Sequence, residues 1–182
     1  MSELYRALRI SDGLHAVGRR DPQRLALECE GRRFTHGELR ERVQRVSGAA
    51  LRELGMNLGD RVAILAPNCA EYPELLCGFS DVGGIVVTLN ARSPAAEIAA
   101  TCRDCSPSVL VAHPSLEAVA REALALGLGD RKARLIVLGS EYERWLASHS
   151  PIDDRELPHF AETEPFTLVY SSGTTGQPKG IV

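Results

Sequence analysis

The sequence lacks any uninterrupted apolar run long enough to cross a bilayer, and its first 21 residues mix charged residues with short apolar steps. We therefore expect neither a membrane span nor a signal peptide. The sequence also lacks a long run of Lys and Arg, and its net charge is -3. Nucleic acids and anionic membranes attract basic surfaces, so we expect neither as a partner. We expect a small molecule to be the partner instead.

Aromatic residues are scarce, at 5% of the 182 residues, and Ala and Leu supply most of the apolar surface. Hydrophobic residues at 44% and charged residues at 25% are typical of a globular protein in an aqueous compartment. The length is sufficient for one domain with its own core. We expect a cytoplasmic protein.

The cysteines do not form a disulfide framework, because there are five of them, an odd number, and they are scattered. Cys102 and Cys105 form the only CxxC pair. A zinc site would need a second pair of ligands, and His113 alone does not supply one. We predict buried, apolar cysteines and no metal site.

Common hydrolase motifs are missing: the chain has no GxSxG and no HExxH. Its five histidines do not cluster in the sequence. We interpret each as a surface or locally hydrogen-bonded residue and predict no catalytic role for it. The five histidines are His15, His36, His113, His149 and His159.

What is present begins with a predicted hairpin over residues 25–34, where apolar residues alternate and Glu30-Gly31 can form the turn. A helix follows at once. Thr35 and Glu38 have the spacing of a capping box, and Gly55 stands where a left-handed C-cap belongs.

Residues 38–149 then repeat short runs rich in Val and Ile, separated by stretches long enough for crossover helices. This rhythm predicts an α/β fold with a mostly parallel, doubly wound sheet and flanking helices, whose strands are buried on both faces. Helix signals include Ser93-Pro94 as an N-cap and first position, an irregular start near Pro73, and an apolar stripe over residues 116–126. The predicted strands are 62–66, 85–89, 109–112, 135–138 and 166–170. Residues 150–165 are predicted as a linker.

The segment 166–182 combines the last predicted strand with a loop of unusual composition, SSGTTGQPKG at 171–180. Glycines let backbone N–H groups approach an anion, hydroxyls donate to phosphate oxygens, and Lys179 adds a positive charge. We predict a loop that binds a polyphosphate, and the simpler alternative is a plain polar surface loop.

Two better-known phosphate motifs do not fit this loop. A Walker A loop needs Gly before its Lys and Ser or Thr after it, but Pro178 and Gly180 occupy those places. A Rossmann fingerprint begins at Gly127 and Gly129 and fails at Lys132.

The segment from Tyr170 to Gly180 resembles the signature of the adenylate-forming (AMP-binding) superfamily, which includes acyl-CoA synthetases, amino-acid-activating modules of peptide synthetases and beetle luciferase. Ser171 stands where Thr is more usual. Upstream landmarks are similar too, in the order Phe34-Thr35, Gly59 to Ile64, Pro67-Asn68 and Leu89-Asn90. Thr88 and Ala91 depart from the pattern, where proline is common.

By this resemblance, the chain is an N-terminal portion, residues 1–182, of the adenylation domain of an acyl-CoA synthetase. Such enzymes use ATP, Mg2+ and coenzyme A to activate a carboxylic acid as an acyl-adenylate and transfer it to a thiol. The resemblance assigns the β- and γ-phosphates of ATP to Ser171, Ser172, Gly173, Thr174, Thr175, Gly176 and Lys179. It places the adenine and acyl pockets, the acidic residue for magnesium and the catalytic lysine outside this segment, so we name no catalytic residue.

Three hypotheses remain open at this point. The chain is part of an acyl- or aryl-CoA ligase and inactive alone, or it begins an amino-acid-activating module that loads a carrier protein. The third hypothesis is a noncatalytic fragment that forms a homodimer through the exposed surface of a truncated sheet.

Overall fold

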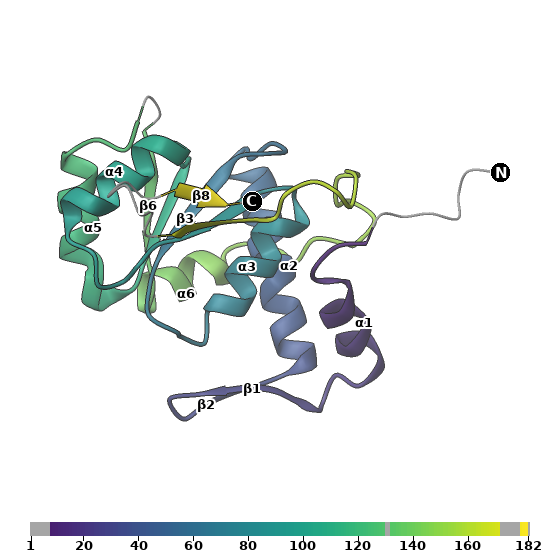
Figure 1. The fold of residues 1–182 in the computed structure, drawn as a ribbon. Helices are drawn as coiled ribbons and strands as arrows, with labels where there is room; N and C mark the ends of the chain where they lie inside the picture. The colour runs from purple at the N-terminus through teal and green to yellow at the C-terminus, as the bar shows by residue number, and fades with distance from the viewer. Residues whose placement is uncertain (1–7, 130–131, 172–178, 182) are drawn as a thin grey trace. The chain divides into compact units, whose positions relative to one another are not determined.

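The computed structural model describes residues 8–129, 132–171 and 179–181. The chain forms two compact units. Figure 1 shows the chain coloured by residue number. Unit 1 comprises Met1–Leu58, Cys69–Gly84 and Trp145–Phe166, and unit 2 comprises Gly59–Asn68, Ile85–Arg144 and Thr167–Val182.

Unit 1 contains the predicted hairpin, formed by β1 (Leu25–Cys29) and β2 (Arg32–Thr35) in antiparallel pairing. Its turn residues Glu30 and Gly31 have φ of 50° and 77°. Two successive residues in this left-handed region make the tight turn whose twist matches a hairpin, and glycine adopts it without a Cβ penalty.

Helix α2 (His36–Arg52) begins as predicted from the sequence, but it ends with Glu53 as its C-cap, two residues before the predicted Gly55. The Glu38 backbone N–H donates to the Thr35 hydroxyl at 3.2 Å, and the Thr35 N–H donates to the Glu38 carboxylate at 2.8 Å. After the helix, Met56 N–H donates to the Ala50 carbonyl at 2.9 Å across Gly55, whose φ is 61°. Both helix termini therefore have hydrogen-bond partners from the local sequence.

Helices α1 (Asp12–Arg20) and α3 (Tyr72–Asp81) pack with α2 around a buried carboxylate. Asp81 accepts hydrogen bonds from Ser11 and from the hydroxyl of Ser47, and His15 Nε2 lies 2.8 Å from it. The interpretation of every histidine as a surface or locally bonded residue is wrong for His15, which is 2% exposed. Its partner lies 66 residues away in the sequence.

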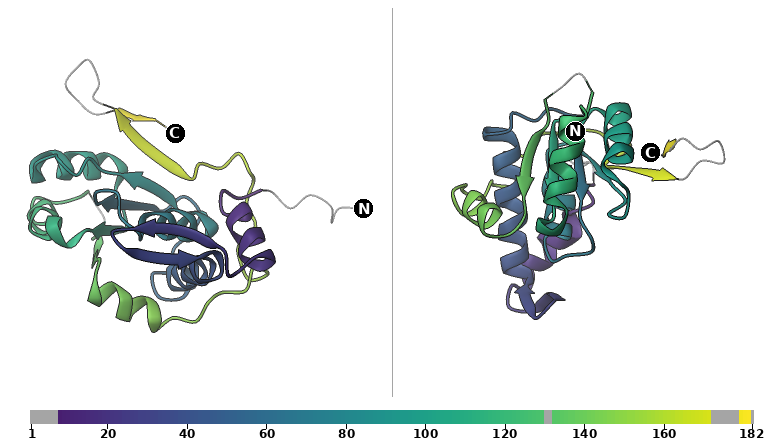
Figure 2. Two further views of the ribbon diagram at one scale, coloured as in Figure 1. Left: turned by 90° about the horizontal axis from the view of Figure 1, so that it is seen from below. Right: turned by 90° about the vertical axis from the view of Figure 1, so that its left-hand side faces the viewer.

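Unit 2 is built on a six-stranded sheet with the order β6-β5-β3-β4-β7-β8. The strands are β3 (Arg61–Leu65), β4 (Ile85–Thr88), β5 (Val109–Ala112), β6 (Arg134–Val137), β7 (Thr167–Ser171) and β8 (Lys179–Ile181). All neighbours pair in parallel except β7 and β8, which pair antiparallel and form the yellow ribbon in Figure 2. The predicted mostly parallel, doubly wound sheet is confirmed.

Burial of the strands is uneven. Every residue of β5 is buried, and so are four of the five in β3, whereas β6 and β7 contain partly and fully exposed positions. The prediction that all five strands are buried on both faces is therefore wrong for β6 and β7. The reason is position, because β6 lies at one edge of the sheet and β7 is flanked by the three-residue strand β8.

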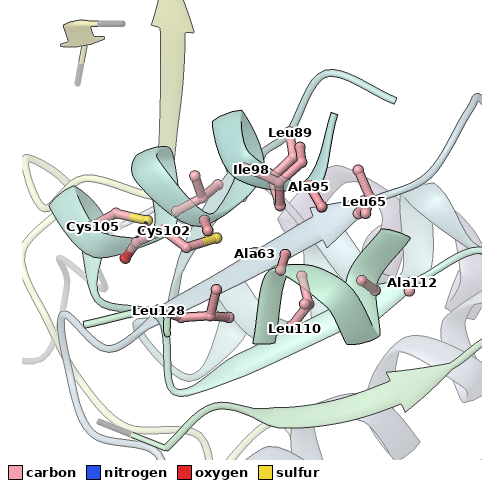
Figure 3. Packing of buried hydrophobic residues seen from close by; sticks show 14 residues of the cluster. Ala63, Leu65, Leu89, Ala95, Ile98, Cys102, Cys105, Leu110, Ala112 and Leu128 are labelled. Atoms are coloured by element: carbon pink, nitrogen blue, oxygen red, sulfur yellow. Dashed lines mark hydrogen bonds between the residues drawn. The ribbon is translucent and has the colours of Figure 1, made fainter. Parts of the chain in front are cut away.

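Helices α4 (Ala95–Cys105) and α5 (Glu117–Ala125), with the short helix η1 (Pro114–Leu116), contribute to one apolar cluster with the sheet. Figure 3 shows Ala63 and Leu65 of β3 and Leu110 of β5 in this cluster together with side chains of α4. Pro94 is the N-cap of α4 and not its first residue, because its extended ψ of 160° precedes the helix. Leu126, predicted in the apolar stripe, follows α5 and is 52% exposed.

Helix α6 (Ser140–Ala147) and helix α1 were not predicted from the sequence. Residues 150–165 contain no regular helix or strand, as predicted, but Ile152 and Leu157 within them are buried. None of the helices in the described part of the chain combines the length and the apolar character needed to cross a membrane.

Candidate phosphate-binding site

The carboxyl ends of β4 and β7 lie side by side in the sheet of unit 2. The strand that follows β4 in the sequence, β5, lies beyond β3 on one side, whereas the strand that follows β7, β8, lies on the other. The connections therefore leave these two neighbours in opposite directions. Doubly wound sheets bind their ligands in the crevice outside the carboxyl ends at such a reversal.

A cavity of about 320 Å³ lies at this reversal. Its size falls in the range of small-molecule sites, which begins at roughly 300 Å³. The residues that line it follow β4, occupy α4 and its approach, or end β7. They are Thr88, Leu89, Asn90, Ser93, Glu97, Ile98, Thr101, Tyr170 and Ser171.

The lining is mixed, with hydroxyl groups and one carboxylate beside apolar side chains. The Asn90 side-chain oxygen accepts a hydrogen bond from the Arg92 N–H at 3.0 Å, which fixes the turn between β4 and α4. Glu97 places a carboxylate in the first turn of α4. The hydroxyls can donate to an anionic ligand, and the carboxylate can accept from a donor group on it.

The segment rich in glycine and hydroxyls joins β7 to β8 as the connection of an antiparallel hairpin. Ser171 and Lys179 are direct Cα partners across this pair, as are Tyr170 and Gly180. Directly opposed residues of an antiparallel pair project their side chains to the same face. The hairpin therefore brings the hydroxyl of Ser171 and the ammonium group of Lys179 to one face at the base of the loop.

Two of the predicted phosphate-binding residues, Ser171 and Lys179, are thus placed and brought together. Both are exposed, and no carboxylate among the described residues pairs with Lys179. The other five predicted residues lie outside the described part of the chain, and their role stays a prediction: Ser172, Gly173, Thr174, Thr175 and Gly176.

Sequence reasoning missed Tyr170 as a site residue. It lines the cavity, and its hydroxyl donates to the Asp104 carboxylate at the end of α4. Burial and this hydrogen bond raise the pKa of Tyr170 above its usual value. The available signal was its place immediately before Ser171, at the carboxyl end of a strand.

The CxxC pair lies nearby in α4 but inside the apolar cluster, where Cys102 is 0% and Cys105 5% exposed. A hydrogen bond with Cys105 and burial raise the pKa of Cys102. No group of three His, Cys, Asp or Glu residues able to hold a metal occurs within residues 8–129, 132–171 and 179–181. The two thiols act as core residues of unit 2.

Comparison with known proteins gives consistent matches. The chain is 32% identical over 163 residues to the fatty acid–[acyl-carrier-protein] ligase ScoC of Streptomyces coeruleorubidus, covering 89% of this chain and 30% of that protein. It is 37% identical over 166 residues to the feruloyl-CoA synthase of an Amycolatopsis species, covering 90% and 31%. The structure of the anthranilate CoA ligase AuaEII in complex with anthranoyl-AMP matches with a TM-score of 0.86 and 26% identity, covering 99% and 34%.

The chain thus spans about a third of the length of each of these proteins. The sequence profile described as AMP-binding enzyme matches residues 14–182, which is nearly the whole chain. The resemblance stated from the segment between Tyr170 and Gly180 is confirmed. This chain belongs to the AMP-binding enzyme family, with acyl-CoA ligases among its relatives.

Proposed function

We propose that this chain is the triphosphate-binding portion of an ATP-dependent ligase. The ligase activates a carboxylic acid as an acyl-adenylate and transfers the acyl group to coenzyme A. Family membership supports the ligase chemistry, and the named relatives include a feruloyl-CoA synthase and an anthranilate CoA ligase. The observation that carries the proposal is the pairing of Ser171 with Lys179 at the base of the loop.

The triphosphate of ATP fits the chemistry of this pair. An ammonium group without a described carboxylate partner is available to a phosphate oxygen, and a hydroxyl on the same face can donate to another. The same role is proposed for the hydroxyls and N–H groups of residues 172–176. These groups would hold the β- and γ-phosphates, so that pyrophosphate is oriented as the leaving group when a carboxylate oxygen attacks the α-phosphorus.

The magnesium ion that accompanies ATP in such ligases would neutralise charge on the phosphates. The described residues offer no cluster of three ligands for it, and we assign no residue of this chain to the metal. We therefore propose for this chain only the binding of the triphosphate.

Binding of inorganic tripolyphosphate to the purified chain tests the assignment directly. We expect weak binding by the wild type, measured by calorimetry at low ionic strength, because the chain spans only about a third of the length of its relatives. Lys179→Ala should weaken binding by about 10-fold, since it removes the point charge. Lys179→Arg should retain most of the affinity because the charge remains.

The chain offers a matched control, because its only other lysine is the exposed Lys132. Lys132→Ala removes the same charge from the same unit and should leave the affinity unchanged after correction for net charge. Equal losses for Lys132→Ala and Lys179→Ala would mean that the anion binds nonspecifically, and the proposal would fail. We further expect no pyrophosphate release from ATP by the chain alone with any carboxylic acid.

A second acyl acceptor is favoured by one observation. ScoC, at 32% identity, is named for transfer to an acyl carrier protein. The candidate alternative is therefore the same adenylation followed by transfer to a carrier-protein thiol. Both versions use the triphosphate in the same way, and an assay of the complete ligase with coenzyme A and with a phosphopantetheinylated carrier protein separates them.

A further inference from the structure

Tyr170 links three elements of unit 2. It belongs to β7, its hydroxyl donates to Asp104 of α4, and it is the Cα partner of Gly180 in β8. Two of these elements, β7 and β8, carry the loop ends, because Ser171 follows Tyr170 directly and Lys179 precedes Gly180.

The hydrogen bond to Asp104 is charge-assisted, because a neutral phenol donates to a carboxylate. The phenol of Tyr170 keeps its proton at neutral pH and remains a donor, and burial together with the neighbouring Asp104 raises its pKa further. Asp104 is exposed and lies in the last turn of α4, next to Cys105, which is anchored in the apolar cluster. The bond therefore ties β7 to a fixed point on the helix.

The opposite strand depends on a glycine. A Cβ added at Gly180 would lie 3.0 Å from Leu168 Cδ1 and 3.3 Å from Tyr170 Cζ. The Tyr170 ring thus lies against the backbone of β8 in space that a side chain would fill. Close approach of an aromatic ring to a strand glycine is one way in which sheets fix their register.

We propose that Tyr170 is a positioning residue that fixes both ends of the phosphate loop, through the Asp104 carboxylate on α4 and through its ring on Gly180 of β8. The loop ends then present Ser171 and Lys179 at a constant separation. The consequence for ligand binding rests on the proposed triphosphate function, whereas the anchoring itself is a property of the fold.

Amide hydrogen exchange measured by NMR at residues 179–181 tests the anchoring without any ligand. Tyr170→Phe keeps the ring and removes the donor, and Asp104→Ala removes the acceptor. Each should accelerate exchange in β8 by about 5- to 10-fold, the range for a partly exposed hydrogen bond to a charged group. Because they delete the same bond, the double variant should exchange no faster than either single variant.

Two further variants separate anchoring from general destabilisation. Asp104→Asn retains an acceptor oxygen and should restore much of the protection. Tyr72→Phe removes a hydroxyl from α3 in unit 1 and should leave exchange in β8 unchanged. Amides of α2 serve as the internal reference for global stability in every variant.

Unchanged exchange at residues 179–181 in Tyr170→Phe, or additive effects in the double variant, would overturn the proposal. Faster exchange with no loss of tripolyphosphate affinity would overturn it as well. If the wild type fails to bind tripolyphosphate while the exchange effects remain coupled, the ligand assignment fails and the anchoring stands.

Discussion

At the residue scale, the reactivity of a thiol depends on its burial and on the charges beside it. Cys69 is only half-buried, as is Cys29, so the prediction of uniformly buried cysteines is wrong for these two. Burial and the charge of Glu71 raise the pKa of Cys69 to about 11. Glu71 stays ionised beside it because, although burial opposes its charge, the hydrogen bond from Arg32 lowers its pKa.

This arrangement predicts slow alkylation of Cys69 at neutral pH. The thiolate is the reactive form, so the rate with iodoacetamide should rise about 10-fold for each pH unit and level off near the pKa of about 11. Glu71→Gln removes the repelling charge and should increase the rate at about pH 8 by several-fold. Peptide-level mass spectrometry measures the rate at this residue alone.

Glu41→Gln is the matched control, because Glu41 is paired with Arg45 on the surface of α2. It should leave the alkylation of Cys69 unchanged. A rate that levels off near pH 8 to 9, the range of an ordinary thiol, would contradict the raised pKa of Cys69.

Residue-scale prediction of the candidate site was limited by range in the sequence. The composition of segment 171–180 predicted a phosphate loop because its chemistry is local. The role of Tyr170 was not predictable, since its partner Asp104 lies 66 residues earlier and depends on how α4 packs. The same holds for His15 and Asp81 in unit 1.

At the element scale, local signals predicted the hairpin and α2 well, because a two-residue turn and a capping box act within a few residues. They missed α1 and α6. Helix α1 has no side-chain N-cap and carries few apolar residues among its charges, and α6 is only eight residues long. Their stability comes from tertiary contacts, which periodicity over eight or nine residues does not reveal.

Packing of α2 against α3 includes a buried ion pair that can be tested. Glu74 on α3 is 1% exposed and accepts two hydrogen bonds from Arg42 on α2, one of them at 2.8 Å from Nη2. Glu74→Ala should lower the free energy of unfolding by about 3 to 5 kcal/mol, because it removes one partner of a buried ion pair. Urea denaturation followed by circular dichroism measures the loss.

The pair of Glu41 and Arg45 provides the comparison, since it has the same charges on the exposed surface of α2. Glu41→Ala should cost about 0.5 kcal/mol or less. Similar losses for Glu74→Ala and Glu41→Ala would show that burial contributes nothing to the interaction between Glu74 and Arg42.

At the scale of the whole molecule, the repeated apolar runs predicted the class and parallel character of the sheet, because fully buried strands are rich in Val and Ile. They did not predict the strand order or the division of the chain into two units, which interleave along the sequence. The exposed character of β7 could not be deduced either. Its alternating Leu168, Val169 and Tyr170 look the same in sequence whether one face or both are covered.

The exposed face of β7 supports a final prediction. We expect the chain to associate with a second copy, as hypothesised from its sequence. Val169 and Ile181 are direct Cα partners on one face of the hairpin of β7 and β8, and they are 47% and 57% exposed. Leu168 and Tyr170, which alternate with Val169, pack against the apolar cluster of unit 2. Paired apolar side chains on an exposed ribbon favour association with a second copy, because association removes them from water.

We therefore expect the apparent mass in light scattering to rise with concentration for the wild type. Val169→Thr with Ile181→Thr keeps β-branched side chains in both strands while lowering the apolar area, so it should reduce the association constant by about 10-fold or more. Leu126→Thr removes a similarly exposed side chain after α5 and should have no effect. A monomer at every concentration, or equal association in the double variant, would mean that this face does not mediate contacts between copies.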